Sequence, residues 1–137
     1  VPERDLFVAR FEGVIAGSAQ LVKPPRNNEA QSFAAASTTH FVAPWARGHG
    51  LARELALAVE NAAHEQGFAI LNLDVRATQT AAIRLFESLG YVRWGSNPTY
   101  AIAAGRLIAG HYYSKRLAAL PDAPEAAHDD TGGAGRP

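Results

Sequence analysis

Cysteine and methionine are both absent from this chain of 137 residues, and the sequence contains no long apolar run. Without cysteine the protein has no disulfide bond, no thiolate nucleophile and no cysteine-ligated zinc or iron–sulfur cluster. No stretch reaches the roughly 18 apolar residues that cross a membrane, and no leader-like segment is evident, so we expect a cytoplasmic protein without a membrane partner. The first residue is valine, which leads us to expect a processed chain, a fragment or a non-standard start codon.

Charge of one sign is not in excess either. Thirteen Lys and Arg balance thirteen Asp and Glu, so the chain has no overall positive field to attract nucleic acid, and we expect no nucleic-acid partner. The five histidines lack metal-ligand spacing, so no metal site is predicted. The length and the 47% hydrophobic content fit one domain at residues 1–117. Residues 118–137 lack aromatic side chains and are predicted to be a disordered tail.

The first third of the chain has the composition of β-structure. Residues 6–11 and 14–22 are rich in β-formers, and Glu12-Gly13 between them predicts a hairpin. Residues 23–31 are polar, contain two prolines and show no period, which indicates a loop. A third strand is predicted at residues 32–42, ended by Pro44.

The remainder alternates between helical and strand periods. Residues 50–66 have the apolar period of a helix that ends at Gly67, and residues 68–75 form an apolar strand of the kind that is buried on both faces of a sheet. A second helix begins at Thr78 or Thr80 and ends at Gly90. Strands are predicted at residues 91–94 and 108–115, joined through turn residues at 96–98 and 104–105. This order, β-β-β-α-β-α-β-β, predicts an α/β sandwich with a mixed sheet.

The segment Arg47-Gly48-His49-Gly50 joins a strand to the first helix and has the character of an anion-binding turn. The first turn of a helix has unpaired backbone N–H groups and the positive end of the helix dipole, and glycine lets a phosphate approach the backbone closely. No Lys-Ser/Thr pair follows the glycines, which disfavours a nucleotide triphosphatase, and Arg53 occupies the third glycine position of a dinucleotide-binding fingerprint. The segment therefore fits a diphosphate ligand better than it fits a nucleoside triphosphate or a dinucleotide bound through these two motifs.

The motifs of the chain resemble those of the GNAT superfamily of acyl-CoA-dependent N-acetyltransferases. Residues 47–52 satisfy that family's cofactor-loop pattern Q/R-x-x-G-x-G/A at every defined position. Residues 79–86, followed by Gly90-Tyr91, are similar to its N-x-x-A-x-x-L-Y segment with two substitutions. The resemblance implies a mixed, mostly antiparallel sheet with helices on both faces, and it implies that the chain lacks the strand and helices that usually precede the hairpin.

The resemblance also implies that acetyl-CoA is the co-substrate, bound by a definite set of residues. The pyrophosphate would lie on the amides of the cofactor loop, and the pantetheine arm would follow the third strand. The implied cofactor-binding residues are Phe41, Val42, Arg47, Gly48, His49, Gly50, Leu51, Ala52, Gln79 and Phe86.

Catalytic residues are less well marked in the sequence. An alkylamine is almost fully protonated at neutral pH, so its proton must be removed by a base or through water. The resemblance implies a glutamate in the stretch 34–40, but this stretch has no carboxylate. His40 is the only side chain in it that commonly acts as a base near neutral pH. Phe86 stands where the resemblance implies a proton-donating tyrosine. The thiolate then leaves unaided or through water, catalysis has weakened, or another hydroxyl substitutes, with the candidates Tyr91, Tyr100, Tyr112 and Tyr113. Tyr100 is the tyrosine that we select for this role.

Three functions remain open at this stage. The first is transfer of an acetyl group from acetyl-CoA to the primary amine of a small molecule by direct attack on the thioester. The second is a non-catalytic acyl-CoA-binding module, and the third is a protein or peptide N-acetyltransferase. The exposed first hairpin also leaves a free strand edge, which makes a homodimer plausible.

Overall fold

Six strands and two α-helices form in the order that the sequence predicts. The computed structural model describes residues 3–27 and 29–121. Neither of the α-helices in this part of the chain is long and apolar enough to cross a membrane. The elements are β1 (Arg4–Phe11), β2 (Val14–Val22), β3 (Ala34–Val42), α1 (Leu51–Glu65), β4 (Ile70–Arg76), α2 (Thr80–Ser88), β5 (Val92–Ala103) and β6 (Arg106–Arg116), with short 3₁₀ turns at Glu29–Gln31 and Pro44–Ala46.

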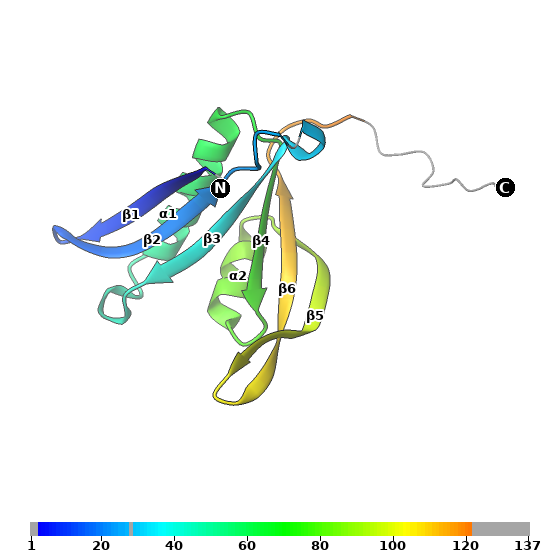
Figure 1. Ribbon diagram of the computed structural model, residues 1–137. Coiled ribbons are helices and arrows are strands. Elements are labelled where there is room, and N and C mark those ends of the chain that lie inside the picture. Colours follow the sequence, from blue (N-terminus) through cyan, green and yellow to red (C-terminus); the bar gives the residue numbers. More distant parts are fainter. Residues whose placement is uncertain (1–2, 28, 122–137) are drawn as a thin grey trace.

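All six strands lie in one sheet with the order β1-β2-β3-β4-β6-β5 (Figure 1). Every neighbouring pair is antiparallel except β3 and β4, which are parallel and are joined by α1. The predicted mixed, mostly antiparallel sheet is therefore confirmed. The parallel pair sits in the middle of the sheet, as expected for strands linked by a helical crossover.

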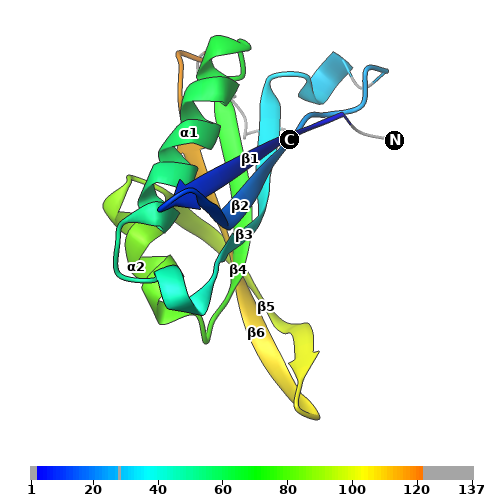
Figure 2. The same ribbon diagram turned by 90° about the vertical axis from the view of Figure 1, so that its left-hand side faces the viewer.

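Both described helices pack on the same face of the sheet (Figure 2), whereas the expectation was helices on both faces. One core holds the apolar sides of both, with Leu55 and Val59 of α1 and Phe86 of α2 packed together with Leu71 and Tyr113 from the strands. The difference arises because α1 connects β3 to β4 and α2 connects β4 to β5, and both connections advance in the same direction across the sheet between parallel strands. Right-handed crossovers that advance in one direction place their helices on one face. The opposite face of the sheet has no helix over it in the described part of the chain.

The strand β4 is buried on one face only, which corrects the prediction of burial on both. Leu71, Leu73 and Val75 are buried beneath the helices, while Asn72 is half-buried and Asp74 is exposed. Side chains alternate between the faces of a strand, so the polar residues of β4 all point to the uncovered face. Asn72 and Asp74 alternate with the apolar residues of this run, and this alternation is the sequence signal of burial on one face only.

The strand β5 is much longer than predicted. It runs without interruption through Asn97 and Pro98, which the sequence indicated as a turn. The pairing with β6 shifts register between Arg93 and Gly95 and again between Asn97 and Ala101. A proline fits in this strand because β5 is an edge strand and Pro98 lies in a break of the ladder, where no N–H is needed. The turn at Ala104-Gly105 forms as predicted.

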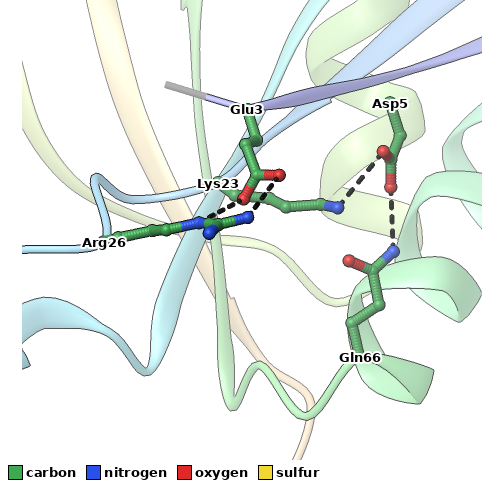
Figure 3. A network of polar contacts seen from close by, with 5 residues as sticks. All are labelled: Glu3, Asp5, Lys23, Arg26 and Gln66. Carbon is green, nitrogen blue, oxygen red and sulfur yellow. Dashed lines mark hydrogen bonds and ion pairs between the residues drawn. The ribbon is translucent and has the colours of Figure 1, made fainter. Parts of the chain in front are cut away.

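Polar contacts tie the start of the chain to the end of α1 (Figure 3). Asp5 accepts a hydrogen bond from Nε2 of Gln66 at 2.9 Å and forms an ion pair with Lys23 at 3.2 Å. Glu3 and Arg26 form a second ion pair beside it at 3.3 Å. At the other end, Leu117 packs against the core. Of the predicted disordered tail, residues 122–137 lie outside the described residues.

Candidate cofactor and acyl-transfer site

The strands β3 and β4 separate soon after they pair, and the site begins at this separation. Three residues of each strand are in register, ending with the pair Ala36 and Asn72. Beyond that pair β3 continues to Val42 and β4 to Arg76, and Figure 1 shows the two ribbons diverging. The facing backbone edges of both strands are therefore free of strand partners over this length and can donate to or accept from a ligand.

A bulge in β3 sets which side chains line the opening. Its pairing with β2 shifts between Ser18 and Gln20, opposite Thr39, whose φ of 51° is left-handed and uncommon for a β-branched residue. Ser37 points to the helical face before the bulge, and His40 and Val42 point to it afterwards. Of the three residues that the sequence singled out in this part of β3, the bulge thus brings His40 and Val42 to the helical side, whereas Phe41 alternates with them.

The loop after β3 leads directly into an uncapped helix start. The 3₁₀ turn at Pro44–Ala46 ends with Arg47, and Gly48 and Gly50 follow with φ of 86° and 79°. Gly50 is the N-cap of α1 and provides no side-chain hydrogen bond to the first turn. The N–H groups of that turn are therefore open to an anion, and no heavy atom lies within 4 Å of the place where a Cβ on either glycine would be.

One cavity connects this loop to the part of β3 that has separated from β4. Its volume is about 520 Å³, within the usual range for small-molecule and cofactor sites. Every predicted cofactor-binding residue except His49 lines it, and so does His40. The lining also includes residues that the sequence analysis did not select. The full lining is His40, Phe41, Val42, Ala46, Arg47, Gly48, Gly50, Leu51, Ala52, Arg53, Leu55, Gln79, Ala81, Ala82, Leu85 and Phe86.

His49 does not line the cavity. Its ring stacks on Phe11 at the end of β1, with ring centroids 4.2 Å apart, and the ring centroid of Trp45 lies 6.5 Å from that of Phe11. The side chain of His49 therefore fixes the loop against the first hairpin, and its predicted contact with the cofactor is reduced to what its backbone can provide.

His40 lies deep in the cavity wall. Its Nε2 is 2.5 Å from the hydroxyl oxygen of Ser37, and the edge of its ring meets Phe86 with centroids 5.1 Å apart. Burial lowers the pKa of His40 to about 4, so the ring is neutral at pH 7. A base with so low a pKa has little driving force to accept a proton from an alkylammonium group.

Tyr100 lies away from the cavity. It extends from β5 over the uncovered face of the sheet, where its hydroxyl donates a hydrogen bond to Asp74. Burial and the neighbouring carboxylate raise the pKa of Tyr100 to about 12. The structure therefore does not bring the two predicted catalytic residues together, since His40 and Tyr100 face opposite sides of the sheet. Sequence reasoning missed Asp74, although it interrupts an apolar strand.

The fold and the cavity define an α/β domain with a glycine-containing loop, suited to an anion, beside two strands that separate. The chain belongs to the acetyltransferase (GNAT) family, because the sequence profile of that family matches residues 1–91. An Azospirillum brasilense protein, described as an uncharacterized N-acetyltransferase of the hisH–hisA intergenic region, is 72% identical over 79 residues. The match covers 58% of this chain and 47% of that protein, so the chain spans about half the length of this relative.

Solved structures share the fold. The ribosomal-protein-alanine N-acetyltransferase of Brucella melitensis is 27% identical and superposes with a TM-score of 0.71, over 81% of this chain and 67% of that one. A Salmonella typhimurium protein, solved with acetyl-CoA as its cofactor, has a TM-score of 0.76 at 24% identity, over 88% of this chain and 68% of that one.

The described residues fit a coenzyme A group. The open space over Gly48 and Gly50, together with the unpaired N–H groups of the first turn of α1, suits a diphosphate. The apolar wall formed by Val42, Leu85 and Phe86 suits an alkyl chain that continues toward the separation of β3 and β4. No group of three or more His, Asp or Glu side chains that could hold a metal ion occurs among residues 3–27 and 29–121.

Proposed function

We propose that this chain transfers an acetyl group from acetyl-CoA to the primary amine of a small molecule, by direct attack of the amine on the thioester. The observation that carries the proposal is the continuous cavity that runs from the glycine loop to the part of β3 that has separated from β4. One end of this cavity suits a diphosphate, and the other end reaches free strand edges where an acyl group can be presented to the opposite face.

The main chain performs the binding step. The amides from Gly48 to Ala52 hold the diphosphate, the side chain of Arg47 adds a positive charge, and Gln79 offers an amide on the far wall. Bound acetyl-CoA supplies the activated acetyl group. A free N–H on the open edge of β3 would stabilise the oxyanion that forms when the amine attacks the carbonyl carbon.

Proton transfer requires groups other than those of the cavity wall. His40 stays neutral and bonded to Ser37, and its low pKa suits a positioning role better than that of a base. Phe86 carries no proton and packs between His40 and Tyr91. The amine proton would therefore leave on the uncovered face of the sheet, and the thiolate of coenzyme A would depart unaided or take its proton from water.

A thiol-release assay tests the proposal. The chain has no cysteine, so a thiol reagent reports only coenzyme A freed by turnover. We expect saturable binding of acetyl-CoA by calorimetry and thiol release that depends on an added amine, with the acetylated amine identified by mass spectrometry. Binding without thiol release from any amine or peptide would instead support the acyl-CoA-binding module.

A peptide acceptor is the second candidate, and the name of the Brucella melitensis structure favours it. The assay separates the two, because a peptide acetyltransferase would release thiol with peptides that have a free N-terminus and not with simple alkylamines. Both candidates need the same cofactor cavity, so the choice between them depends on the acceptor side alone.

A further inference from the structure

Three aromatic rings on the uncovered face of the sheet form a connected set, and one of them, that of Tyr100, is bonded to Asp74. The ring of Trp94 stacks on that of Tyr112, with centroids 5.3 Å apart and an angle of 25° between the planes. Tyr100 meets Tyr112 edge-on at 6.2 Å and donates its hydroxyl hydrogen bond to Oδ2 of Asp74. These four residues come from β4, β5 and β6, and they form what we name the aromatic–carboxylate cluster.

The sheet itself fixes the position of this cluster. Asp74 and Tyr112 are directly paired in the register of β4 and β6. Gly110 lies two residues before Tyr112, and a Cβ there would overlap the ring atoms of Tyr100. The ring of Tyr100 therefore occupies space that exists only because residue 110 is glycine, which shows that the cluster is a packed arrangement rather than a set of loose surface side chains.

Among the residues that the structure describes, the carboxylate of Asp74 has no cationic partner. Asp74 is exposed, and none of the ion pairs among the described residues includes it. Arg76 lies two residues further along β4, and its charge acts on the hydroxyl of Tyr100 without pairing with Asp74. An exposed carboxylate beside aromatic rings is suited to an ammonium cation, which it attracts by charge while the rings attract it through their faces.

The cluster also lies where an acceptor must approach. Asp74 is two residues beyond the last β3–β4 pair, so it borders the opening between the strands. The cofactor cavity lies on the helical side and is lined by the separated part of β3, at His40, Phe41 and Val42, whereas Asp74 points to the other face of the sheet. A group bound at the cluster and an acyl group in the cavity would meet through the opening from opposite faces of the sheet.

We propose that the aromatic–carboxylate cluster binds the ammonium form of the acceptor, with Asp74 as the charge partner and Tyr112 and Trp94 as the apolar wall. This inference rests on the proposed function and names its substrate class, an aliphatic primary ammonium. A small alkylamine and a peptide N-terminus share that chemistry, and the test distinguishes them.

Equilibrium binding tests the inference without relying on turnover. The sequence contains two tryptophans, so Trp45→Phe leaves Trp94 as the only indole and its fluorescence as the reporter. The protein, saturated with coenzyme A, is titrated at constant ionic strength with n-butylammonium and with n-butanol. A second arm compares a tetrapeptide that has a free N-terminus with the same peptide acetylated there.

We expect saturable binding of n-butylammonium and none of n-butanol at the same concentration. Asp74→Asn keeps an acceptor for the Tyr100 hydroxyl but removes the charge, and it should weaken n-butylammonium binding about tenfold or more. Tyr112→Leu should weaken it about threefold. The matched control Glu65→Gln removes one exposed negative charge at the far end of α1 and should change the affinity less than about twofold.

Two results would overturn the inference: equal binding of n-butylammonium and n-butanol, or unchanged n-butylammonium affinity in both the Asp74 and Tyr112 variants. Either result, with coenzyme A binding intact by calorimetry, leaves the cofactor site standing and rejects only the acceptor assignment. If the parent protein does not bind coenzyme A, the proposed function is rejected instead. The titration with n-butylammonium is then carried out without coenzyme A, and the same two results decide the inference. Preference for the free-N-terminus tetrapeptide over n-butylammonium would identify the peptide source of the same chemistry.

Discussion

His40 is the residue whose environment has the clearest measurable consequence. Burial lowers its pKa from the ordinary 6.5 to about 4, so the unfolded chain binds a proton at this position over a pH range in which the folded chain does not. Stability linked to His40 is therefore present above pH 6.5 and is lost as the pH falls toward 4. The loss reaches about 2 kcal/mol at pH 5, since each unit of pKa shift corresponds to about 1.4 kcal/mol.

We predict that His40→Asn removes this pH dependence. Asparagine keeps a hydrogen-bonding group near Ser37 but does not titrate, so the difference in unfolding free energy between pH 7 and pH 5 should shrink by about 2 kcal/mol. Urea denaturation at the two pH values measures it. The other histidines are common to both proteins and cancel in the comparison. If the unfolding free energy changed equally between pH 7 and pH 5 in the parent and the variant, His40 would not be buried as described.

The connection from β3 into α1 is the element on which the cofactor site depends. Gly50 has a left-handed backbone, so any side chain introduced there is strained, and a single substitution cannot distinguish strain from charge. The isosteric pair Gly50→Glu and Gly50→Gln makes that distinction, because both side chains strain the loop equally and only one of them repels a diphosphate.

We predict that Gly50→Glu binds acetyl-CoA at least about tenfold more weakly than Gly50→Gln at low salt. The difference in acetyl-CoA affinity between the two variants should decrease as salt is added, because salt screens the charge at this exposed position. Calorimetry at two salt concentrations measures both affinities, and circular dichroism checks that the fold is retained. Identical affinities for the two variants would mean that no anion binds at the start of α1.

The polar contacts of Asp5 join β1 to the end of α1. The hydrogen bond from Gln66, followed by the ion pair with Lys23, holds the pKa of Asp5 below its usual 3.8. This contribution is present at neutral pH and is lost as the pH falls below 3.8. Asp5→Ala should cost about 0.5–1.5 kcal/mol at pH 7, and Glu3→Ala, in a more exposed pair, should cost less. Thermal denaturation of both variants ranks them, and a larger cost for Glu3→Ala would contradict this reading.

The order and type of the elements could be predicted from the sequence because their signals are local. The apolar period that predicts α1 and the glycines that flank this helix lie in one continuous segment. The pattern of the cofactor loop also lies within one short segment, residues 47–52. The aromatic–carboxylate cluster could not be found this way, because it depends on the register that brings Asp74 beside Tyr112. The length of β5 was also missed, since only the edge position of that strand makes Pro98 acceptable.

At the scale of the whole molecule, the sheet has one covered face and one open face, and β1 forms one of its edges. Leu6 and Val8 of β1 are 64% and 46% exposed on the side away from the helices. A free edge with exposed apolar side chains favours pairing with another strand. We therefore expect the chain to self-associate through β1 as its concentration rises.

We predict that Val8→Lys shifts this equilibrium toward monomer, because a lysine at the edge opposes strand pairing. Sedimentation velocity over a range of concentrations measures it. The control Leu107→Lys also adds a lysine at an exposed apolar position, on β6 near the tip of the β5–β6 hairpin, and should leave the equilibrium unchanged. A parent protein that is monomeric at every concentration would contradict the prediction.

The central claim is that main-chain amides at the start of α1 hold a diphosphate while the arm attached to it follows the opening between β3 and β4. A crystal structure of the chain grown with acetyl-CoA tests this claim most directly. The predicted result is a pyrophosphate within hydrogen-bond distance of the amides of residues 48–52 and a pantetheine arm that runs between the two strands. Acetyl-CoA bound at any other place, or absent at saturating concentration, would contradict the account.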